Sequence, residues 1–293
     1  MTQFRPGRFQ VLPPVVKNLL IINVLMVLLQ FVLVKFGIDL ADYLGLHYWR
    51  SSLYKPWQLL THMFMHGSAY DVNLTVLHIF ANMFALWMFG SVLENVWGAK
   101  RFIIFYLICG LGAALMHLGV LHYGYSQIEK AFLVYQENPT LDQFSLFLQQ
   151  HVPKALPDPT RINQILVQWH NDPSSMRLSN ESISWIHDYL YGHGYKSMHI
   201  KGIFDEATVG ASGAVFGILF AFAYLFPNTL LYIYFLVPIK AKYVIAAYAI
   251  FELYAGIQNS AGDNVAHFAH LGGMLVAFII LKFWNRKIRN RFY

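Results

Sequence analysis

Charged residues are scarce in this chain of 293 residues. They make up 12% of it, whereas ordinary soluble domains carry about 25%. The hydrophobic share is correspondingly high, at 57%, and much of it lies in long apolar runs of the kind that span bilayers. The shortage of charge therefore excludes an ordinary soluble domain and predicts a polytopic membrane protein.

Cysteine is almost absent as well, and acids are fewer than bases. The single cysteine, Cys109, lies in an apolar run, so it excludes an intrachain disulfide. Fifteen acids against 21 bases give a net charge of +6. Because the basic residues cluster at the ends of apolar runs, we attribute the excess to the positive-inside rule and expect no nucleic-acid partner.

Six apolar segments predict an all-α membrane protein with six transmembrane helices. The first is interpreted as a retained helix, because it exceeds a signal-peptide core of about 7–15 residues and lacks a small-x-small cleavage site. A short apolar stretch, residues 229–237, is either interfacial or the start of the fifth span. The expected spans are residues 19–36, 74–97, a third ending near 123, 210–226, 242–255 with some preceding residues, and 265–284.

The acids gather in one region, which predicts an insertion. Residues 124–206 hold nine of the fifteen acids, together with short amphipathic segments such as 128–136 and 162–169 that are too short to span. We expect an inserted, helical, extramembrane subdomain there. The expected division is a cytoplasmic segment at 1–17, spans one to three with the first outer loop at 18–123, the insertion at 124–206, spans four to six at 207–285 and a basic tail at 286–293.

Basic residues also predict the orientation. Twelve of the 21 lie on the side that holds both termini, so this side is expected to be cytoplasmic and the insertion to face outward. The short chain without a transit peptide favours a bacterial plasma membrane. We therefore expect an integral multi-pass protein in a lipid bilayer, whose oligomeric state the sequence does not fix.

Polar residues within spans are costly, and two of them indicate catalysis. Ser212 begins the fourth span, and His270 lies in the sixth. Both accompany small residues spaced i, i+3, i+7, which let two helices approach closely. Such a contact brings a serine hydroxyl against an imidazole, its usual activating base, although either residue alone could simply pack. The small residues are Gly210, Gly213 and Gly217 in span four, and Gly273 and Ala277 in span six.

Three further histidines and an asparagine have competing interpretations. His267 ranks second as the base, because its six-residue offset from Gly273 points it away from the small face. His78 and Asn82 lie one turn apart on span two. They could donate to an oxyanion or form a hydrogen bond between helices. These two residues alone favour the hydrogen bond between helices. His62 is followed one turn later by a second histidine, as in the H-E-x-x-H motif of zinc hydrolases. Met63 stands where that motif has its glutamate, so we expect no zinc site.

These motifs, taken in order, resemble the rhomboid intramembrane serine proteases. The matching stretches are His78-x-x-x-Asn82, Gly90-x-x-x-Glu94-x-x-x-Gly98, Gly210-Ala211-Ser212-Gly213 and Ala269-His270-x-x-Gly273. The resemblance covers about residues 18–122 and 207–285. One departure is Trp57-Gln58, which stands where the family often has Trp-Arg before the second span, although a Trp49-Arg50 pair occurs earlier in the chain. The 124–206 insertion has no counterpart in the smallest members.

The resemblance implies a function. It implies a Ser212–His270 dyad without a third acid, an oxyanion site formed by the Ser212 backbone, Asn82 and His78, and a structural role for Glu94. It also implies transmembrane protein substrates that are cut within or beside their spanning helix, with no cofactor or metal. A segment at 256–264 is expected to be a loop that caps the site.

Two other functions compete with this one. A non-catalytic relative that binds and escorts transmembrane helices is expected to have lost the serine or the histidine, and this chain has both. A transporter is expected to show inverted repeats, and we find none. Glu252, an acid within span five, is assigned no role by the sequence.

Overall fold

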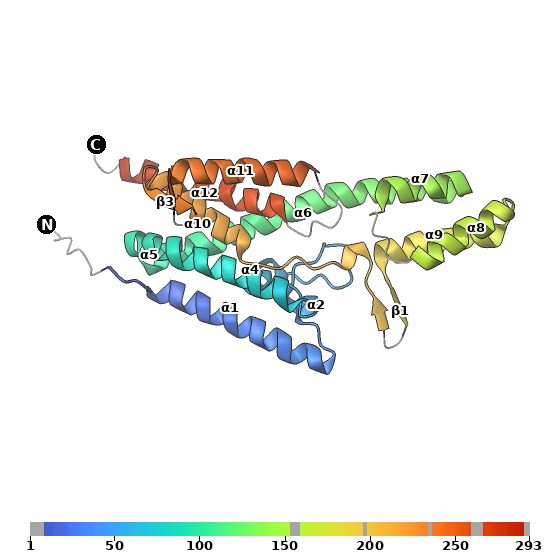
Figure 1. Ribbon diagram of the computed structural model, residues 1–293, viewed down its shortest axis with the longest axis horizontal. Coiled ribbons are helices and arrows are strands. Elements are labelled where there is room, and N and C mark those ends of the chain that lie inside the picture. Colours follow the sequence, from blue (N-terminus) through green and yellow to red (C-terminus); the bar gives the residue numbers. More distant parts are fainter. Residues whose placement is uncertain (1–8, 153–158, 196–197, 234–235, 259–265, 290–293) are drawn as a thin grey trace.

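Three long helices form the first half of the membrane bundle in the computed structural model, which describes residues 9–152, 159–195, 198–233, 236–258 and 266–289 (Figure 1). The first is α1 (Pro14–Leu33), extended by a 3₁₀ turn, η1 (Val34–Phe36). The second joins α4 (Val72–Ala85), a π-helical turn η3 (Leu86–Gly90) and α5 (Ser91–Trp97). The third is α6 (Ala99–Glu137).

The second half consists of α10 (Ser212–Leu225), α11 (Ala241–Gln258) and α12 (His267–Arg289). Figure 1 shows α11 alongside α12, with α10 next to them. Among the described residues, four stretches are long and apolar enough to cross a membrane: Pro14–Phe36, Val72–Trp97, Ala99–Glu137 and His267–Trp284. The fourth expected span is α10, which is apolar but only 14 residues long, and the fifth is α11, which carries Lys242 and Glu252.

Helix α10 is short because it lies within the bundle, and small residues let it fit there. A Cβ placed on Gly273 of α12 would lie 1.9 Å from the carbonyl oxygen of Gly213. A Cβ on Gly213 would lie 2.3 Å from Ala113 Cβ, and one on Gly217 2.8 Å from Cys109 Sγ. Helix α10 is thus enclosed by α6 and α12 at distances that only glycine allows.

The insertion is helical and has its own apolar core. Helix α6 passes residue 123 without a break and leads into α7 (Leu141–His151), α8 (Pro159–Asn171) and α9 (Met176–Tyr191). These helices extend from one end of the bundle (Figure 1) around buried aromatic residues that include Phe144, Trp169 and Trp185. The strands β1 (His193–Tyr195) and β2 (Met198–Ile200) and the turn η4 (Ile203–Asp205) lead back to α10.

The loop between spans one and two is organised by Gln58 instead of an arginine. This loop includes α2 (Leu40–Leu44), α3 (Gln58–Thr61) and η2 (His62–Phe64). The buried Gln58 side chain accepts from the Lys55 N–H at 3.0 Å and donates to the Leu53 carbonyl at 2.9 Å. Trp57 Nε1 donates to the Tyr43 carbonyl at 3.0 Å. An uncharged amide therefore supplies the donor and acceptor that the loop backbone needs.

The loop also joins the bundle to the insertion. Tyr48 is buried in the aromatic core of the insertion, and Ser51 Oγ donates to Asp205 Oδ1 at 2.6 Å. Arg50 forms a bidentate pair with Glu129 on the outer part of α6, with Nη2 2.8 Å from Oε1. The insertion is therefore packed against the loop and is not a free appendage.

Two sequence expectations about loops have different outcomes. The described part of the stretch 229–237 does not begin span five, because α11 starts at Ala241. It belongs to an antiparallel hairpin of β3 (Leu230–Ile233) and β4 (Val237–Lys240), with Leu230 opposite Lys240. In the expected loop at 256–264, the first three residues end α11, and residues 259–264 lie outside the part that the structure describes.

Candidate active site

Ser212 is the first residue of α10, and glycine places it there. Gly210 has φ +133, a conformation that side chains disfavour, and its N–H donates to the His62 carbonyl at 2.9 Å. The chain thus turns sharply into the helix. Because the first N–H groups of a helix have no intrahelical acceptor, the Ser212 backbone N–H is available to an incoming oxygen.

His270 lies one turn into α12, against Ser212. Its Nε2 is 2.8 Å from Ser212 Oγ, although 58 residues separate the two. His270 is buried, and its imidazole stacks on Phe216 of α10, with ring centroids 4.1 Å apart and planes within 5°. The close packing of Gly213 on Gly273 holds the two helices at the spacing that this hydrogen bond requires.

A carboxylate lies behind the histidine, and here the structure differs from the expected dyad without a third acid. Glu252 Oε2, on α11, is 2.9 Å from His270 Nδ1 and 2.6 Å from His267 Nδ1. The Glu252 side chain is 3% exposed and both imidazoles are 9% exposed. An ionised carboxylate can only accept, so the ring nitrogens that face it donate. His267 therefore contacts the acid, and His270 contacts the serine.

The same three side chains have the composition of a metal site. Their ligand atoms lie within 4.8 Å of one another, and two imidazoles with one carboxylate are ligands typical of catalytic zinc. The hydrogen bonds that both histidines donate to Glu252 already account for this arrangement without an ion.

The two side chains expected to stabilise the oxyanion, His78 and Asn82, have different surroundings in the structure. A Cβ on Gly210 would lie 3.0 Å from His78 Nε2 and 3.5 Å from Ser212 Oγ, so His78 and the serine line the same small space. The neighbouring His66 ring contacts the His78 ring edge to face, at 5.2 Å between centroids. Asn82 Nδ2 donates to the His78 carbonyl of its own helix at 3.0 Å, which leaves its second amide hydrogen for another acceptor.

Glu94 lies away from this site and caps another helix. Its two carboxylate oxygens accept from the backbone N–H groups of Val15 and Val16, at 3.0 and 2.8 Å. These N–H groups are at the start of α1, where a negative charge is also favoured by the helix dipole. The geometry gives Glu94 a structural function between spans one and two.

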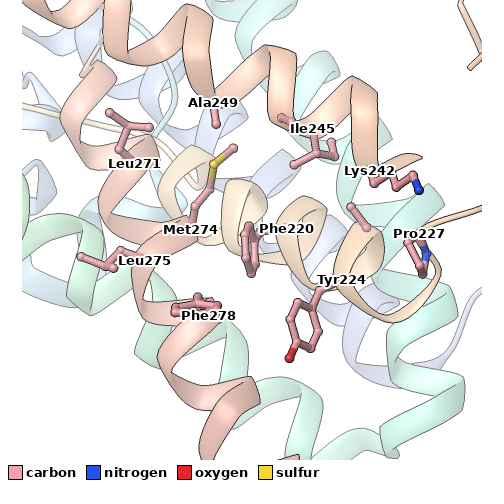
Figure 2. Close-up of a pocket in the computed structure, with 12 residues that line it drawn as sticks. Phe220, Tyr224, Pro227, Lys242, Ile245, Ala249, Leu271, Met274, Leu275 and Phe278 are labelled. Atoms are coloured by element: carbon pink, nitrogen blue, oxygen red, sulfur yellow. The ribbon is translucent and has the colours of Figure 1, made fainter. Parts of the chain in front are cut away.

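A separate apolar groove opens between α10, α11 and α12. Figure 2 shows Phe220 and Tyr224 of α10 facing Ile245 of α11 and Phe278 of α12. The groove has a volume of about 600 Å³. Ser212 and His270 are not among its lining residues, so it is distinct from the candidate catalytic site.

The sequence model of the rhomboid domain matches residues 54–134 and 181–286, more than half of the chain. This chain belongs to the rhomboid family. The resemblance that its motifs indicated is confirmed, and so is the fold class, an all-α membrane bundle. This rhomboid is therefore an integral membrane protein of the lipid bilayer. The gap in the match, residues 135–180, covers α7, α8 and the start of α9. Comparison with curated proteins gives no match.

One functional candidate, Glu252, was missed by reasoning from sequence. The sequence did contain an indication of this residue, because an acid inside an apolar helix is rare and marks function. What the sequence lacked was the rotation of α11, which decides whether residue 252 faces lipid or the site. The adjacent residues Phe251 and Leu253 are 57% and 47% exposed, whereas Glu252 is 2% exposed.

Proposed function

We propose that this rhomboid is an intramembrane serine endopeptidase that cuts transmembrane proteins within or beside their spanning helix. The observation that carries the proposal is the 2.8 Å contact between His270 Nε2 and Ser212 Oγ at the start of α10. A serine becomes an effective nucleophile when an adjacent base takes its proton. A non-catalytic helix binder has no need of this pair.

The proposed reaction begins at this contact, and its oxyanion donors are those that the family resemblance implies. Ser212 Oγ attacks the substrate carbonyl carbon while its proton moves to His270 Nε2. The developing oxyanion is stabilised by the Ser212 backbone N–H, the His78 side chain and the second amide hydrogen of Asn82. His270 then gives its proton to the leaving amine, and an ester remains on Ser212. Water, deprotonated by His270, attacks this ester and releases the second product.

Hydrolysis in a bilayer needs water at the serine. Helix α10 has 14 residues, so at 1.5 Å per residue it is about 21 Å long, less than the hydrocarbon thickness of about 30 Å. With Leu225 at one membrane boundary, Ser212 at the other end of α10 lies below the opposite surface, and an aqueous cavity must reach it. With the insertion on the outer face, as the basic residues indicate, that cavity opens outward.

The substrate must also offer an unpaired peptide bond. Helical peptide groups are hydrogen-bonded within the helix, so a transmembrane substrate has to unwind before it reaches Ser212. Glycine and proline weaken helices by about 1 and 3 kcal/mol. We therefore expect substrates with such residues near the membrane edge.

The test is reaction with a fluorophosphonate probe and cleavage of a model substrate. Purified protein in liposomes is labelled, and the adduct is located by mass spectrometry. We expect the adduct on Ser212 and its loss in Ser212→Ala and His270→Ala. Ser126→Ala, which removes a hydroxyl on the outer part of α6, is the matched control and keeps full labelling. An unlabelled Ser212 together with an intact substrate contradicts the proposal and favours a helix-binding escort.

A further inference from the structure

We propose that Glu252 is a positioning residue that completes the Ser212–His270 pair as a triad within the membrane, and that His267 holds Glu252 in place. The inference rests on the proposed protease function and goes beyond the dyad that the family resemblance implies. Its basis is the position of one carboxylate oxygen, Glu252 Oε2, within hydrogen-bond distance of Nδ1 of both histidines.

The burial of Glu252 is the first argument. Its neighbours in α11, Phe251 and Leu253, are more than 45% exposed on the outer surface of the bundle, whereas Glu252 is 2% exposed. A buried charge in a membrane protein is costly, and such residues pair with one another or mark a functional path. The orientation of α11 thus places its one acid against the catalytic histidine.

The hydrogen-bond chemistry is the second argument. A neutral imidazole has one N–H and one lone pair, and the partner of one nitrogen decides which form is present. Glu252 accepts at Nδ1 of His270, so Nδ1 carries the hydrogen and Nε2 presents its lone pair to Ser212. When Nε2 takes the serine proton, the carboxylate stabilises the imidazolium and remains unprotonated itself.

His267 has a defined part in this arrangement. It lies one turn before His270 on α12, and its Nδ1 hydrogen points to the same oxygen of Glu252 at 2.6 Å. Two donors on one oxygen restrict the carboxylate to a single orientation. His267 therefore holds the acid in place, and His270 performs the proton transfer.

The experiment measures kcat and KM for a transmembrane substrate in liposomes, together with the rate of fluorophosphonate labelling. Glu252→Gln keeps the size of the side chain but places a donor beside Nδ1, which favours the wrong form of His270. In soluble serine proteases the equivalent change lowers kcat by about 10⁴-fold. We expect a fall in kcat of about 10²- to 10⁴-fold with KM unchanged, and an equal fall in labelling rate.

Three variants separate positioning from a structural effect. Glu252→Asp keeps the charge, and we expect it to recover at least about tenfold of the kcat lost in Glu252→Gln. His267→Asn keeps a donor near the Nδ1 position and should stay close to wild type, whereas His267→Leu should lose about tenfold. Glu94→Gln is the matched control, since it also neutralises a buried acid within a span and should leave kcat unchanged.

The outcomes are distinguishable from failure of the proposed function. If wild type neither labels nor cleaves, the protease proposal fails. If wild type is active and Glu252→Gln matches it, the triad is wrong. Activity that a chelator abolishes and zinc restores also overturns the triad, because the cluster is then a metal site. Should Glu252→Gln fail to fold, the same bond is tested by a low-field Nδ1 proton resonance, which we expect in wild type and in Glu252→Asp. Its absence from wild type overturns the triad.

Discussion

At Gly273 a single methyl group is expected to decide whether the catalytic pair can form. A Cβ there would lie 1.9 Å from the Gly213 carbonyl oxygen, a backbone atom that moves only with α10. We predict that Gly273→Ala lowers stability by about 1–3 kcal/mol through overpacking and lowers kcat by more than about 100-fold, because His270 is displaced from Ser212. Thermal unfolding and substrate cleavage measure the two effects.

The matched control for this substitution is Gly124→Ala. Gly124 lies in α6, and a Cβ on it meets no atom within 4 Å, so the change should leave activity intact and slightly favour the helix. Full activity in Gly273→Ala would show that α10 and α12 can separate without loss of the pair. The packing argument would then be wrong.

The contact of Ser212 with His270 was accessible from the sequence, because the small residues beside each one have a regular spacing along a helix. The contact of His270 with Glu252 was not accessible in the same way. Helix α11 has small residues on several faces, among them Ala246, Ala247, Ala249 and Gly256, so their spacing alone does not fix its rotation. Its exposed residues are also as apolar as a buried surface. The rotation of a helix surrounded by lipid depends on its neighbours, which the sequence of α11 alone does not specify.

Among the helices, α1 depends on an acid from another element. Glu94, in α5, accepts from the Val15 and Val16 N–H groups, and its side chain is buried. We predict that Glu94→Gln, which loses the charge and one acceptor and so leaves a backbone N–H unpaired, lowers stability by about 1–3 kcal/mol. Thermal unfolding followed by circular dichroism in detergent measures this loss.

The control for Glu94 is Glu137→Gln, the same change at an exposed acid at the end of α6. It should leave the unfolding temperature unchanged. If the two variants unfold together, the cap contributes nothing measurable. Activity below the unfolding temperature should be normal in both, because Glu94 is remote from Ser212.

The ends of helices and strands could be predicted where the composition changes sharply along the chain. They could not be predicted where the composition stays the same across the end of an element. The ends of the second span follow from its polar flanks, with Asp71 as the cap of α4. Helix α6 continues beyond residue 123 because its apolar face passes without interruption from the bundle to the core of the insertion. The strands β3 and β4 are apolar apart from Lys240 at the end of β4, and a short apolar run has no period that distinguishes a strand from a helix.

Across the whole molecule, the loop between spans one and two connects the bundle to the insertion, and the ion pair of Arg50 with Glu129 is part of this connection. The Arg50 guanidinium, by its hydrogen bonds, holds the pKa of Glu129 below its ordinary value, while partial burial opposes this shift. A lowered pKa in the folded protein means that the contact stabilises above the ordinary pKa of a glutamate and is lost as pH falls through the lowered value.

We predict that Glu129→Gln loosens the docking of the loop without unfolding the bundle. Amide hydrogen exchange at residues 46–52 should be faster in the variant than in wild type at neutral pH, while exchange in α10 stays the same. As pH falls below the ordinary range of glutamate, wild-type Glu129 becomes protonated and the difference between the two proteins should shrink. Arg177→Gln breaks an exposed pair with Glu181 in the insertion and is the control. Equal exchange in all three proteins would show that Tyr48 and Ser51 suffice to hold the loop, and that the charge pair does not couple the insertion to the bundle.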